Sequence, residues 1–584
     1  MKKTKFLSLV LATVLSLGTA SAFASCESGG GGGGGSADNG GTNSTVETID
    51  TEKTQLFIRN YQGGFGNKWL YNGKEKFEKK YEGVSLEPGK KGLQVLITDK
   101  KETPNIANIK NDIYEVYFVE KIQYLYLVNQ GVVADMTDAV TKENAFETGK
   151  TIESKLSDEQ KDFYGIKKDG ETKYYALPHY VAMQGIVYDM DLFEDRGYFF
   201  AKGYETKTDL SEKFIIDSGD TKSAGPDATY GNEDDGLPAT YADFWDLCEY
   251  IYQDGYTPLN WGGKGSEFYI TALMIQLMAD YQGRDQFMMN STFEGVMNDM
   301  IKIENGEIVF DSEGNPVMES VQLDPAKNNG YETYRNASYY YALGFVHKLI
   351  SSMERYSDSS KTGTTSYTAF DAQDDYVQSR HATKAKRMAM LIEGSWWDSE
   401  TTDTFNDMVL TYGDKAKKEN CRYGWLPLPK ANAAQVEKKV KNTMLNTIDA
   451  LCFVKEGLAA WKEELAMEFV QLMHTDEALV DFTVQTNAYK DFNYSIDAAT
   501  VAKLSPFGQE MYKDWTSYDI ISFNHNNTQY YNTTYMTAST RRYGISTTDA
   551  FPNLVFAANN KMTPEEYFVK TFDYVRMSNA LWNK

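Results

Sequence analysis

Short apolar runs alternate with helical spacing of apolar residues in the first part of the chain, and this pattern predicts an α/β fold. Apolar runs predict strands at residues 54–59, 93–98 and 112–119. Between the first two runs, apolar side chains recur at helical spacing over residues 68–81. Strand–helix–strand alternation is typical of an α/β unit with a largely parallel sheet.

Two longer helices are indicated by apolar periodicity together with helix-capping residues. Thr240 and Asp243 fit a capping box at the start of a helix that reaches about Ile251. Thr563, followed by Pro564 and two glutamates, begins a final helix that runs to about residue 582. The other expected elements are a helix over residues 458–473, a helix over 124–129, a loop over 132–140 and a hairpin over 302–317.

The first 25 residues have the pattern of an export signal. Three lysines in the first five residues precede an apolar stretch over residues 6–17 that is too short to span a bilayer. Small residues then lead to a cleavage site, so residues 1–25 are predicted to be a secretory signal peptide. No other segment has 18 consecutive apolar residues, and we expect no further membrane span.

Cys26 and the glycines after it predict a lipid-anchored tether. Residues 26–45 are rich in Gly, Ser and Asn, with seven consecutive glycines at Gly29–Gly35, and such a run cannot bury apolar surface. The context of Cys26 resembles a bacterial lipoprotein signal, in which this cysteine becomes the lipidated first residue, with Phe23 where leucine is common. The alternative is ordinary signal cleavage after Ala24, which would release the protein without lipid.

Composition narrows the class of protein. The 584 residues include 59 Lys+Arg and 83 Asp+Glu, a net charge of −24 that argues against nucleic acid or an anionic membrane surface as main partner. A hydrophobic fraction of 41% with 14% aromatics excludes a wholly disordered chain. Without Cys26, the remaining cysteines are an odd number among apolar or aromatic neighbours, and we predict buried thiols at Cys248, Cys421 and Cys452.

The usual catalytic motifs are missing, so catalysis is unsupported rather than disproved, and we expect a protein that is not an enzyme and requires no cofactor. There is no G-x-S-x-G elbow, no Walker loop, and no zinc spacing among the five widely separated histidines. A carboxylate pair for glycoside hydrolysis remains open, because 83 acids are available and separation in sequence does not report separation in space.

Four segments carry motifs whose order along the chain is informative. The first is a strand, glycine-rich loop and helix over residues 55–81, and the second is the Y-x-L-P crossover and apolar strand over 174–196. The third joins RMAMLIEGSWW at 387–397 to YGWLPLP at 423–429, and the fourth is the helical segment 459–482. Taken in this order, they resemble bacterial extracellular solute-binding proteins, the lipid-tethered receptors of ABC importers, in the branch that contains the maltose-binding protein. Extra residues near 200–236 and 300–335 depart from the family's usual length.

The resemblance implies a two-lobed, periplasmic-binding-protein-like α/β fold of type 2, with hinge crossovers and a ligand cleft between the lobes. It assigns residues 46–180 plus 427–480 to lobe I and residues 181–426 plus 481–584 to lobe II. The crossings are expected near residues 180–187, 423–428 and 480.

The implied function is the capture of a carbohydrate, an oligosaccharide above all, and its delivery to the permease subunits of an ABC transporter. The implied location is the extracellular face of the cytoplasmic membrane, where a lipid anchor holds a monomer that has no nucleic-acid partner. A receptor of the same fold for a peptide or polyol is one alternative. A cell-surface glycoside hydrolase is another, and a structural adhesin is a third.

Aromatic rings and acidic groups in these segments are the candidate ligand-binding residues, because a sugar offers an apolar face and a rim of hydroxyls. The family's sugar-stacking Trp corresponds to Trp396. Core packing is the alternative for the tryptophan pair 396–397, for Phe65 with Trp69 and for His179, and plain exposure is the alternative for Glu393. The candidate set is Trp396, Trp397, Glu393, Trp261, Tyr61, Phe65, Trp69, Glu120, Tyr124, His179 and Tyr180.

An acidic loop over residues 217–236 raises the question of a structural metal. Its carboxylates are interleaved with glycines and would suit Ca²⁺, which takes six to eight oxygen ligands, although the spacing is not that of an EF-hand. A solvated acidic loop is the alternative. The candidate ligands are Asp217, Asp220, Asp227, Asp234 and Asp235.

Overall fold

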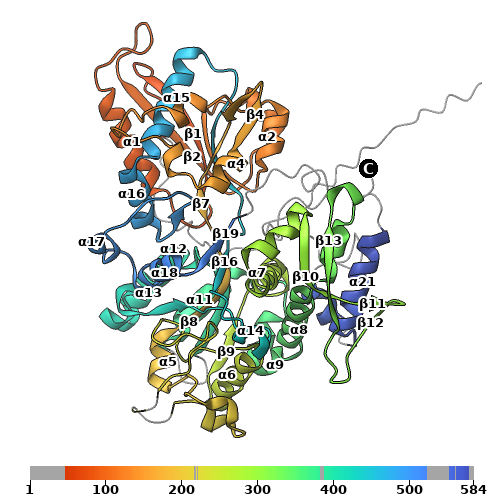
Figure 1. Ribbon diagram of the computed structural model, residues 1–584. Coiled ribbons are helices and arrows are strands. Elements are labelled where there is room, and N and C mark those ends of the chain that lie inside the picture. The colour runs from red at the N-terminus through yellow and green to blue at the C-terminus, as the bar shows by residue number, and fades with distance from the viewer. Residues whose placement is uncertain are drawn as a thin grey trace, which may run out of the picture. The chain divides into compact units, whose positions relative to one another are not determined.

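The computed structural model describes residues 47–215, 219, 221–381, 387–522, 552–558 and 561–577. These residues all belong to one compact unit, which is built around two β-sheets (Figure 1). The predicted signal peptide, Cys26 and the tether lie outside the described residues, as do Asp217 and Asp220. No helix in the described ranges is long and apolar enough to cross a membrane.

The first sheet has five strands in the order β2-β1-β3-β17-β6. Strands β1, β2 and β3 are parallel to one another, and β17 is antiparallel to both of its neighbours, β3 and β6. The predicted parallel α/β unit is therefore present, with one antiparallel strand added from much later in the chain. The strand bounds are β1 Thr54–Tyr61, β2 Leu93–Lys100, β3 Val116–Glu120, β6 Leu177–Pro178 and β17 Ala450–Val454.

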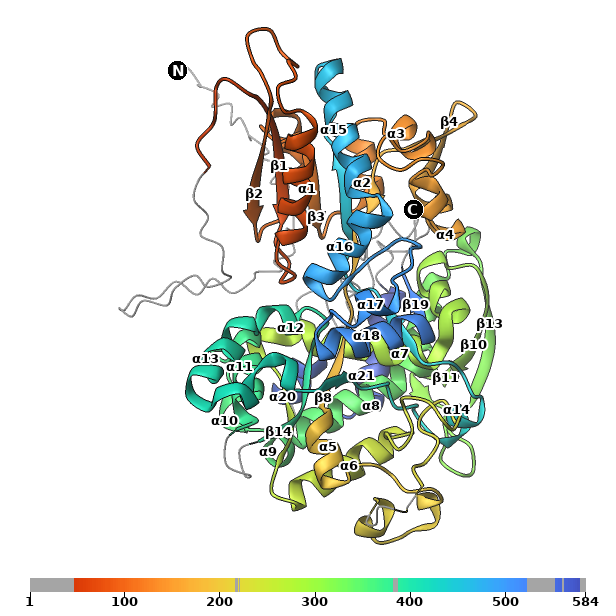
Figure 2. The ribbon, with the colours of Figure 1, turned by 90° about the vertical axis from the view of Figure 1, so that its left-hand side faces the viewer.

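Helices α1 (Lys68–Lys80), α15 (Ala460–Met473) and α16 (Asp476–Thr486) pack together beside the first sheet, as both views of the ribbon show (Figures 1 and 2). Their buried side chains, Phe77, Phe469 and Phe482 among them, join the strands in one apolar core. Helices α1 and α15 confirm the predictions from periodicity. Smaller helices complete this part: α2 Tyr124–Gln130, α3 Thr137–Thr141 and α4 Asp158–Tyr164.

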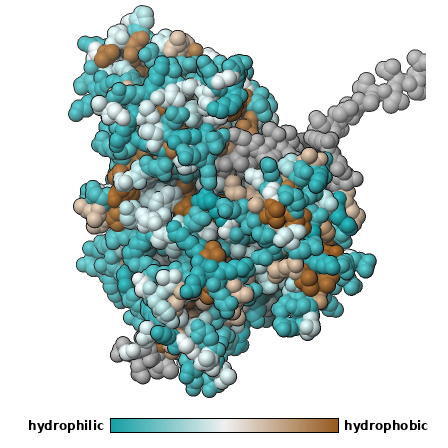
Figure 3. All heavy atoms as spheres, viewed as in Figure 1, coloured by the Kyte–Doolittle hydropathy of each residue, from teal (hydrophilic) through white to brown (hydrophobic). Residues whose placement is uncertain are grey.

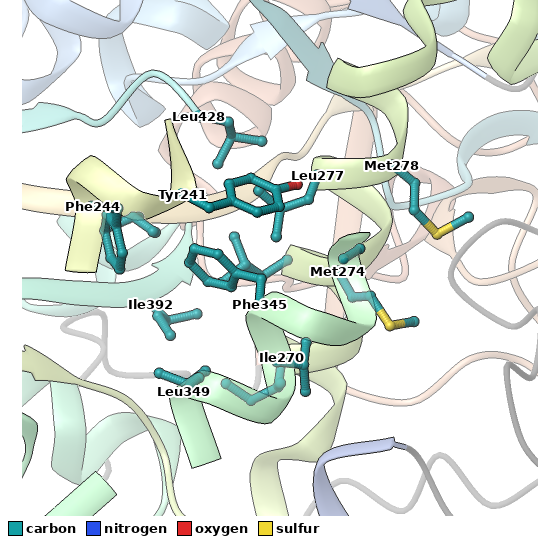
Figure 4. Close-up of a cluster of buried hydrophobic side chains, with 14 of the residues drawn as sticks. Tyr241, Phe244, Ile270, Met274, Leu277, Met278, Phe345, Leu349, Ile392 and Leu428 are labelled. Carbon is teal, nitrogen blue, oxygen red and sulfur yellow. The ribbon is translucent and has the colours of Figure 1, made fainter. Parts of the chain in front are cut away.

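The second sheet has four strands in the order β15-β8-β14-β9, and every residue of β8 and β14 is buried. Strand β8 is antiparallel to both neighbours, whereas β14 and β9 are parallel. Helices α6, α7 and α8 cover this sheet with an apolar cluster that Figure 4 shows in close-up. The bounds are β8 Gln184–Asp189, β9 Thr257–Asn260, β14 Met388–Gly394, β15 Tyr423–Trp425, α6 Tyr241–Gln253, α7 Glu267–Thr292 and α8 Ala337–Ser351.

Helix α6 begins with the predicted capping box, since the Thr240 side chain accepts from the N–H of Asp243, whose carboxylate accepts from the N–H of Thr240.

The predicted hairpin is present and is larger than expected, because β10 (Gly295–Ile301) pairs with β13 (Met318–Leu323) and encloses β11 (Ile303–Glu304) and β12 (Glu307–Ile308). Helix α21 (Pro564–Met577) confirms the described part of the predicted final helix. Cys248, Cys421 and Cys452 are buried free thiols, as predicted.

Two chain segments pass side by side between the sheets. The first is residues 179–183, between β6 and β8, close to the crossing expected at 180–187. The second is residues 446–449, between β16 (Thr443–Leu445) and β17. They are joined by hydrogen bonds, for example from the Thr447 N–H to the Ala182 carbonyl at 2.9 Å.

The second passage lies later in the chain than the crossing expected at 423–428. Leu428 packs in the second-sheet cluster (Figure 4), and the buried Lys430 side chain is paired with Asp280 of α7 at 2.8 Å. The predicted lobe I segment 427–480 therefore begins with residues that contact the second sheet's helices. The sequence indicates that an apolar residue is buried, or that a buried charge is paired, but it does not indicate in which of the two cores the residue lies. The exact limits of the two lobes stay a prediction.

Other elements near the second sheet are α11 Ala369–Ser379, α12 Trp397–Glu400, α13 Thr402–Tyr412, α18 Pro506–Ser517 and α20 Pro552–Ala558. Two short pairings lie beside the passages, β7 (Tyr180–Val181) with β18 (Tyr489–Lys490), and β16 with β19 (Asp519–Ile521). The expected third crossing near 480 falls inside α16, so the chain leaves the first-sheet helices after Thr486. The face in Figure 3 is mostly hydrophilic, with apolar residues in separate small patches.

Candidate functional site

The glycine-rich loop after β1 meets the turn after β14. The ring of Phe65 lies 6.4 Å from that of Trp396 and 5.1 Å from that of Tyr180, both edge-on. The ring of Tyr269, at the start of α7, is 6.1 Å from Trp396 on another side. Residues that follow strands of the two different sheets, and one from the first passage between them, thus form a single aromatic group.

Glycine allows this close approach at two places. A Cβ on Gly63 would lie 1.9 Å from Oε1 of Glu120 and 2.7 Å from the Tyr180 hydroxyl, so a side chain there would displace both groups. A Cβ on Gly394 would lie 2.3 Å from the Trp396 ring, which folds back over the end of β14. The turn after Gly394 is tied to the first passage, because the Ser395 N–H donates to the Met183 carbonyl at 2.8 Å.

Three carboxyl groups surround the aromatic group. Glu120 ends β3 and Glu393 lies in β14, while Glu400 of α12 is the nearest side chain to Gly64. The Gln373 amide nitrogen donates to Oε1 of Glu393 at 2.9 Å and to Oε2 of Glu400 at 2.8 Å. We call the set Phe65, Glu120, Tyr180, Tyr269, Gln373, Glu393, Trp396 and Glu400 the candidate site.

Burial and mutual repulsion favour the neutral forms of these acids. Burial raises the pKa of Glu120 to about 8, and the nearby Glu400 adds to the shift while Lys121 opposes it. Burial raises the pKa of Glu400 to about 7, against the Gln373 hydrogen bond and the charge of Lys101. The pKa of Glu393 is raised well above its ordinary value by burial and by Glu400. Near neutral pH the site therefore holds neutral carboxyl groups that can both donate and accept hydrogen bonds.

Two polar atoms in this site have no hydrogen-bond partner among the described atoms. They are Oε2 of Glu393 and the hydroxyl oxygen of Tyr180, and both are buried. Buried polar atoms in native proteins normally have partners, and the hydroxyls of a sugar can serve both of these oxygens. Aromatic faces next to hydroxyl, amide and carboxyl groups match the apolar face and hydroxyl rim of a saccharide.

The raised pKa values predict how stability depends on pH. The folded protein holds protons on Glu120 and Glu400 that the unfolded chain releases above about pH 4.5, so the free energy of unfolding should fall as pH rises from about 5 to 8. Glu400→Gln cannot titrate and should reduce this slope, while Glu437→Gln, at an exposed position, should leave it unchanged. Thermal unfolding across this pH range measures both. If the stability of wild type and Glu400→Gln depended on pH to the same extent, Glu400 would not have a raised pKa in the folded protein.

Two further sequence-predicted residues lie directly beneath the candidate site. Trp69 packs against Phe118 and Phe482, each with ring centroids 5.2 Å away, and its indole N–H donates to the Gly66 carbonyl at 3.3 Å. His179 is buried and contacts Trp69, with ring centroids 5.2 Å apart. Their contacts are those of the core-packing alternative, although Trp69 also holds the glycine loop.

Tyr61 and Tyr124 have different surroundings. Tyr61 ends β1 beside the site, where its hydroxyl accepts from Lys121 Nζ at 3.3 Å and the burial of its ring raises its pKa. Tyr124 is buried in the first-sheet core, and its hydroxyl donates to the Tyr164 carbonyl at 2.6 Å. The structure therefore places Tyr61 at the edge of the candidate site and Tyr124 in a separate packing environment.

Trp261 and Trp397 are not brought to the aromatic group. Trp261 is buried in the second-sheet core, where it lines a small cavity of about 20 Å³ with Ile270 and Asn553. Trp397 is fully buried in a third cluster, with its ring 5.1 Å from Tyr423 and 5.2 Å from Phe507. Neither makes a ring contact with Trp396 among the described residues. Their role in ligand binding stays a prediction.

The described part of the acidic loop uses its carboxylates within the chain. Asp234 is buried, accepts from Asn442 Nδ2 at 2.9 Å, and has its pKa raised to about 7 by burial. Asp227 accepts from the Thr229 N–H at 2.7 Å, and Asp235 from the Gly231 N–H at 2.8 Å. Within the described ranges no group of three or more acidic, His or Cys side chains is arranged to hold a metal ion. The Ca²⁺ hypothesis stays a prediction.

Sequence reasoning missed Tyr269, Gln373 and Glu400. Tyr269 and Gln373 come from helices that periodicity did not predict, α7 and α11, and no strand end marks them. The sequence contains a weak indication of Glu400. It lies one helical turn after Trp396, and residues one turn apart share a face of a helix.

No protein-family model and no curated protein sequence matches this chain. Solved structures do match it. A chitin oligosaccharide binding protein has a TM-score of 0.50 and 13% identity, covering 91% of this chain and 100% of its own. The solute-binding protein RafE in complex with raffinose has a TM-score of 0.48 at 13% identity, covering 91% and 100%. The GacH receptor of Streptomyces glaucescens has a TM-score of 0.47 at 13% identity, covering 91% and 99%.

Identity at this level shows the fold alone. The likeness extends over both sheets and the helices that cover them. The chain has the two-lobed α/β fold of the chitin oligosaccharide binding protein over nine-tenths of its length.

Proposed function

We propose that this protein captures a saccharide, an oligosaccharide above all, at the candidate site between its two sheets. The observation that carries the proposal is the contact of Phe65 with Trp396 beside the unpartnered oxygens of Tyr180 and Glu393. A sugar ring stacked on Trp396 presents hydroxyls that can donate to such acceptors on either side of it. The chitin oligosaccharide binding protein, which shares the fold, supports this class of ligand.

We further propose that the captured sugar is handed to the permease subunits of an ABC importer, with the protein held as a lipid-anchored monomer at the extracellular face of the cytoplasmic membrane. The support is the signal-like sequence 1–25, Cys26 and the glycine tether after it. Mass spectrometry of the exported protein should find a diacylglyceryl-Cys26 terminus, and an N-terminus at Ser25 would show that ordinary signal cleavage prevails.

A thermal-shift screen followed by small-angle scattering tests the capture step. Chitin oligosaccharides and raffinose are the first probes, followed by a wider glycan panel, small polyols and peptides. A ligand at 100 times its Kd stabilises the folded state by about 2.7 kcal/mol, so a binder should raise the melting temperature measurably. Closure of two lobes on that ligand should also lower the radius of gyration.

The outcomes of the screen separate the candidate functions. A rise in melting temperature with saccharides alone supports the proposal. A rise only with a peptide or polyol would keep the fold and replace the ligand class. New reducing ends after incubation with an oligosaccharide would show a glycoside hydrolase instead, and an unchanged radius of gyration on binding would count against closure.

A further inference from the structure

Lys490 places a fully buried amine among aromatic rings. Its residue exposure is 0%, and in the described part of the chain no acidic side chain forms an ion pair with it. Its Nζ donates to Nδ1 of His179 at 2.5 Å. Three aromatic rings face the Nζ, with centroids at 4.6 Å for Trp69, 4.8 Å for Phe482 and 5.3 Å for Phe118. We call these three rings the Lys490 cage. An ammonium so placed is costly, because only the hydrogen bond to His179 and the ring contacts offset its desolvation, with no carboxylate paired to it among the described residues.

Among the described residues, no titratable group around the cage forms an ion pair with the Lys490 amine. Cys452 of β17 is buried, and its burial raises the pKa of the thiol to about 12. Burial lowers the pKa of His179, and Lys490 and His474 lower it further. Burial lowers the pKa of His474 to about 3, with Lys490 adding to the shift. Burial raises the pKa of Asp491, the next residue, to about 6, and its carboxylate interacts with Gln160 and Ser522 instead of Lys490. Burial accordingly lowers the pKa of Lys490 to about 7.

The cage supports two sides of the candidate site. Trp69 donates to the carbonyl of Gly66, the last residue of the loop that carries Phe65. Lys490 lies opposite Tyr180 in the β7–β18 pairing, and the His179 ring to which it donates is 4.7 Å from the Tyr180 ring. A rearrangement around the Lys490 amine would therefore move the glycine loop, because Trp69 contacts both. It would also move the first passage between the sheets, because His179 lies in that passage.

We infer that Lys490 is a positioning residue that holds the glycine loop and Tyr180 in place through Trp69 and His179, and that gain of a proton by its buried amine loosens this arrangement. Only one consequence of the inference rests on the proposed function: the affinity for a saccharide should fall as the Lys490 amine becomes charged. Its test uses no ligand, so a failure of saccharide binding and a failure of this inference are separate results.

The pH dependence of stability has a definite sign. The unfolded chain binds a proton at this lysine up to about pH 10.5, and the folded protein only up to about pH 7, so Lys490 lowers stability most below pH 7. Between pH 7 and 9 the wild type should gain stability relative to Lys490→Met, by about 3 °C in melting temperature. Lys503→Met, at an exposed position, should differ from wild type by the same amount at each pH.

A second readout follows the cage directly. In protein labelled with ¹⁵N-tryptophan, the indole N–H signal of Trp69, identified by its loss in Trp69→Phe, should titrate with a midpoint near pH 7. In Lys490→Met the same signal should have no midpoint near pH 7, because the neighbouring histidines stay neutral and the thiol stays protonated there, while the pKa of Asp491 is about 6. A melting-temperature difference between Lys490→Met and wild type that is constant with pH, or a Trp69 signal that titrates equally in both, would overturn the inference.

Discussion

Trp397→Ala should lower the free energy of unfolding by about 3–5 kcal/mol, the usual cost of removing a large buried side chain. Trp397 is fully buried, with rings of Tyr376, Tyr423 and Phe507 5.1–6.0 Å from its own. These neighbours come from three different elements, so the cavity left behind cannot close by a local shift. Urea denaturation of the purified protein measures the loss.

Trp397→Phe is the matched control for this change. The indole N–H of Trp397 has no acceptor in the described part of the chain, so phenylalanine keeps most of the ring volume and removes an unpaired donor. Its cost should be well under half that of the alanine variant. If Trp397→Ala unfolds like the wild type but loses saccharide affinity, Trp397 is a ligand-contacting residue and its placement in the core is wrong.

Trp396→Ala should weaken saccharide binding about 5- to 30-fold and change stability far less than Trp397→Ala. A ring stacked on a sugar and desolvated with it contributes at least about 1–2 kcal/mol, and 1.4 kcal/mol corresponds to tenfold in affinity. Trp396 is 8% exposed and lies at the edge of the first-sheet apolar cluster, where it contacts Phe65 and Tyr269, whereas Trp397 is fully buried. Calorimetry with the saccharide found in the screen gives the affinity, and a melting curve on the same sample gives the stability.

Trp461→Ala, on the exposed side of α15 at 38% exposure, is the control for loss of a tryptophan as such, and it should change neither quantity. Unaltered affinity in Trp396→Ala would remove Trp396 from the site, and Trp397 and Trp261 would then be tested by the same two measurements. A large loss of stability with unaltered affinity would assign Trp396 to packing between the sheets.

Much of the candidate site could be predicted because its residues follow apolar strands. Phe65 follows β1, Glu120 ends β3 and Trp396 follows β14, and each strand is recognisable as a short apolar run. Since loops at strand ends carry ligand groups in α/β proteins, these positions stand out from the sequence pattern alone. Tyr180 was marked by the proline two residues before it in the first passage.

Helix α7 shows where periodicity fails. Leu273, Met274, Ile275, Leu277 and Met278 are all buried, as is Gln276 between them, so the helix has no exposed face over its central turns and therefore no amphipathic pattern. Apolar periodicity consequently predicted neither this helix nor Tyr269 at its start.

The amino-acid sequence by itself determined the α/β class, the bounds of most first-sheet elements, the acidic and aromatic character, and which residues follow strands. These properties depend on spacing of 2 or 3.6 residues and on capping groups, which act within a few residues of one another. Only the tertiary structure decided that Glu120, Glu393 and Glu400 share one site, that adjacent Trp396 and Trp397 enter different environments, and that Lys490 is enclosed by aromatic rings. Such contacts join residues far apart in the chain, and burial, which sets their pKa values and their energetic weight, exists only once both sheets are packed.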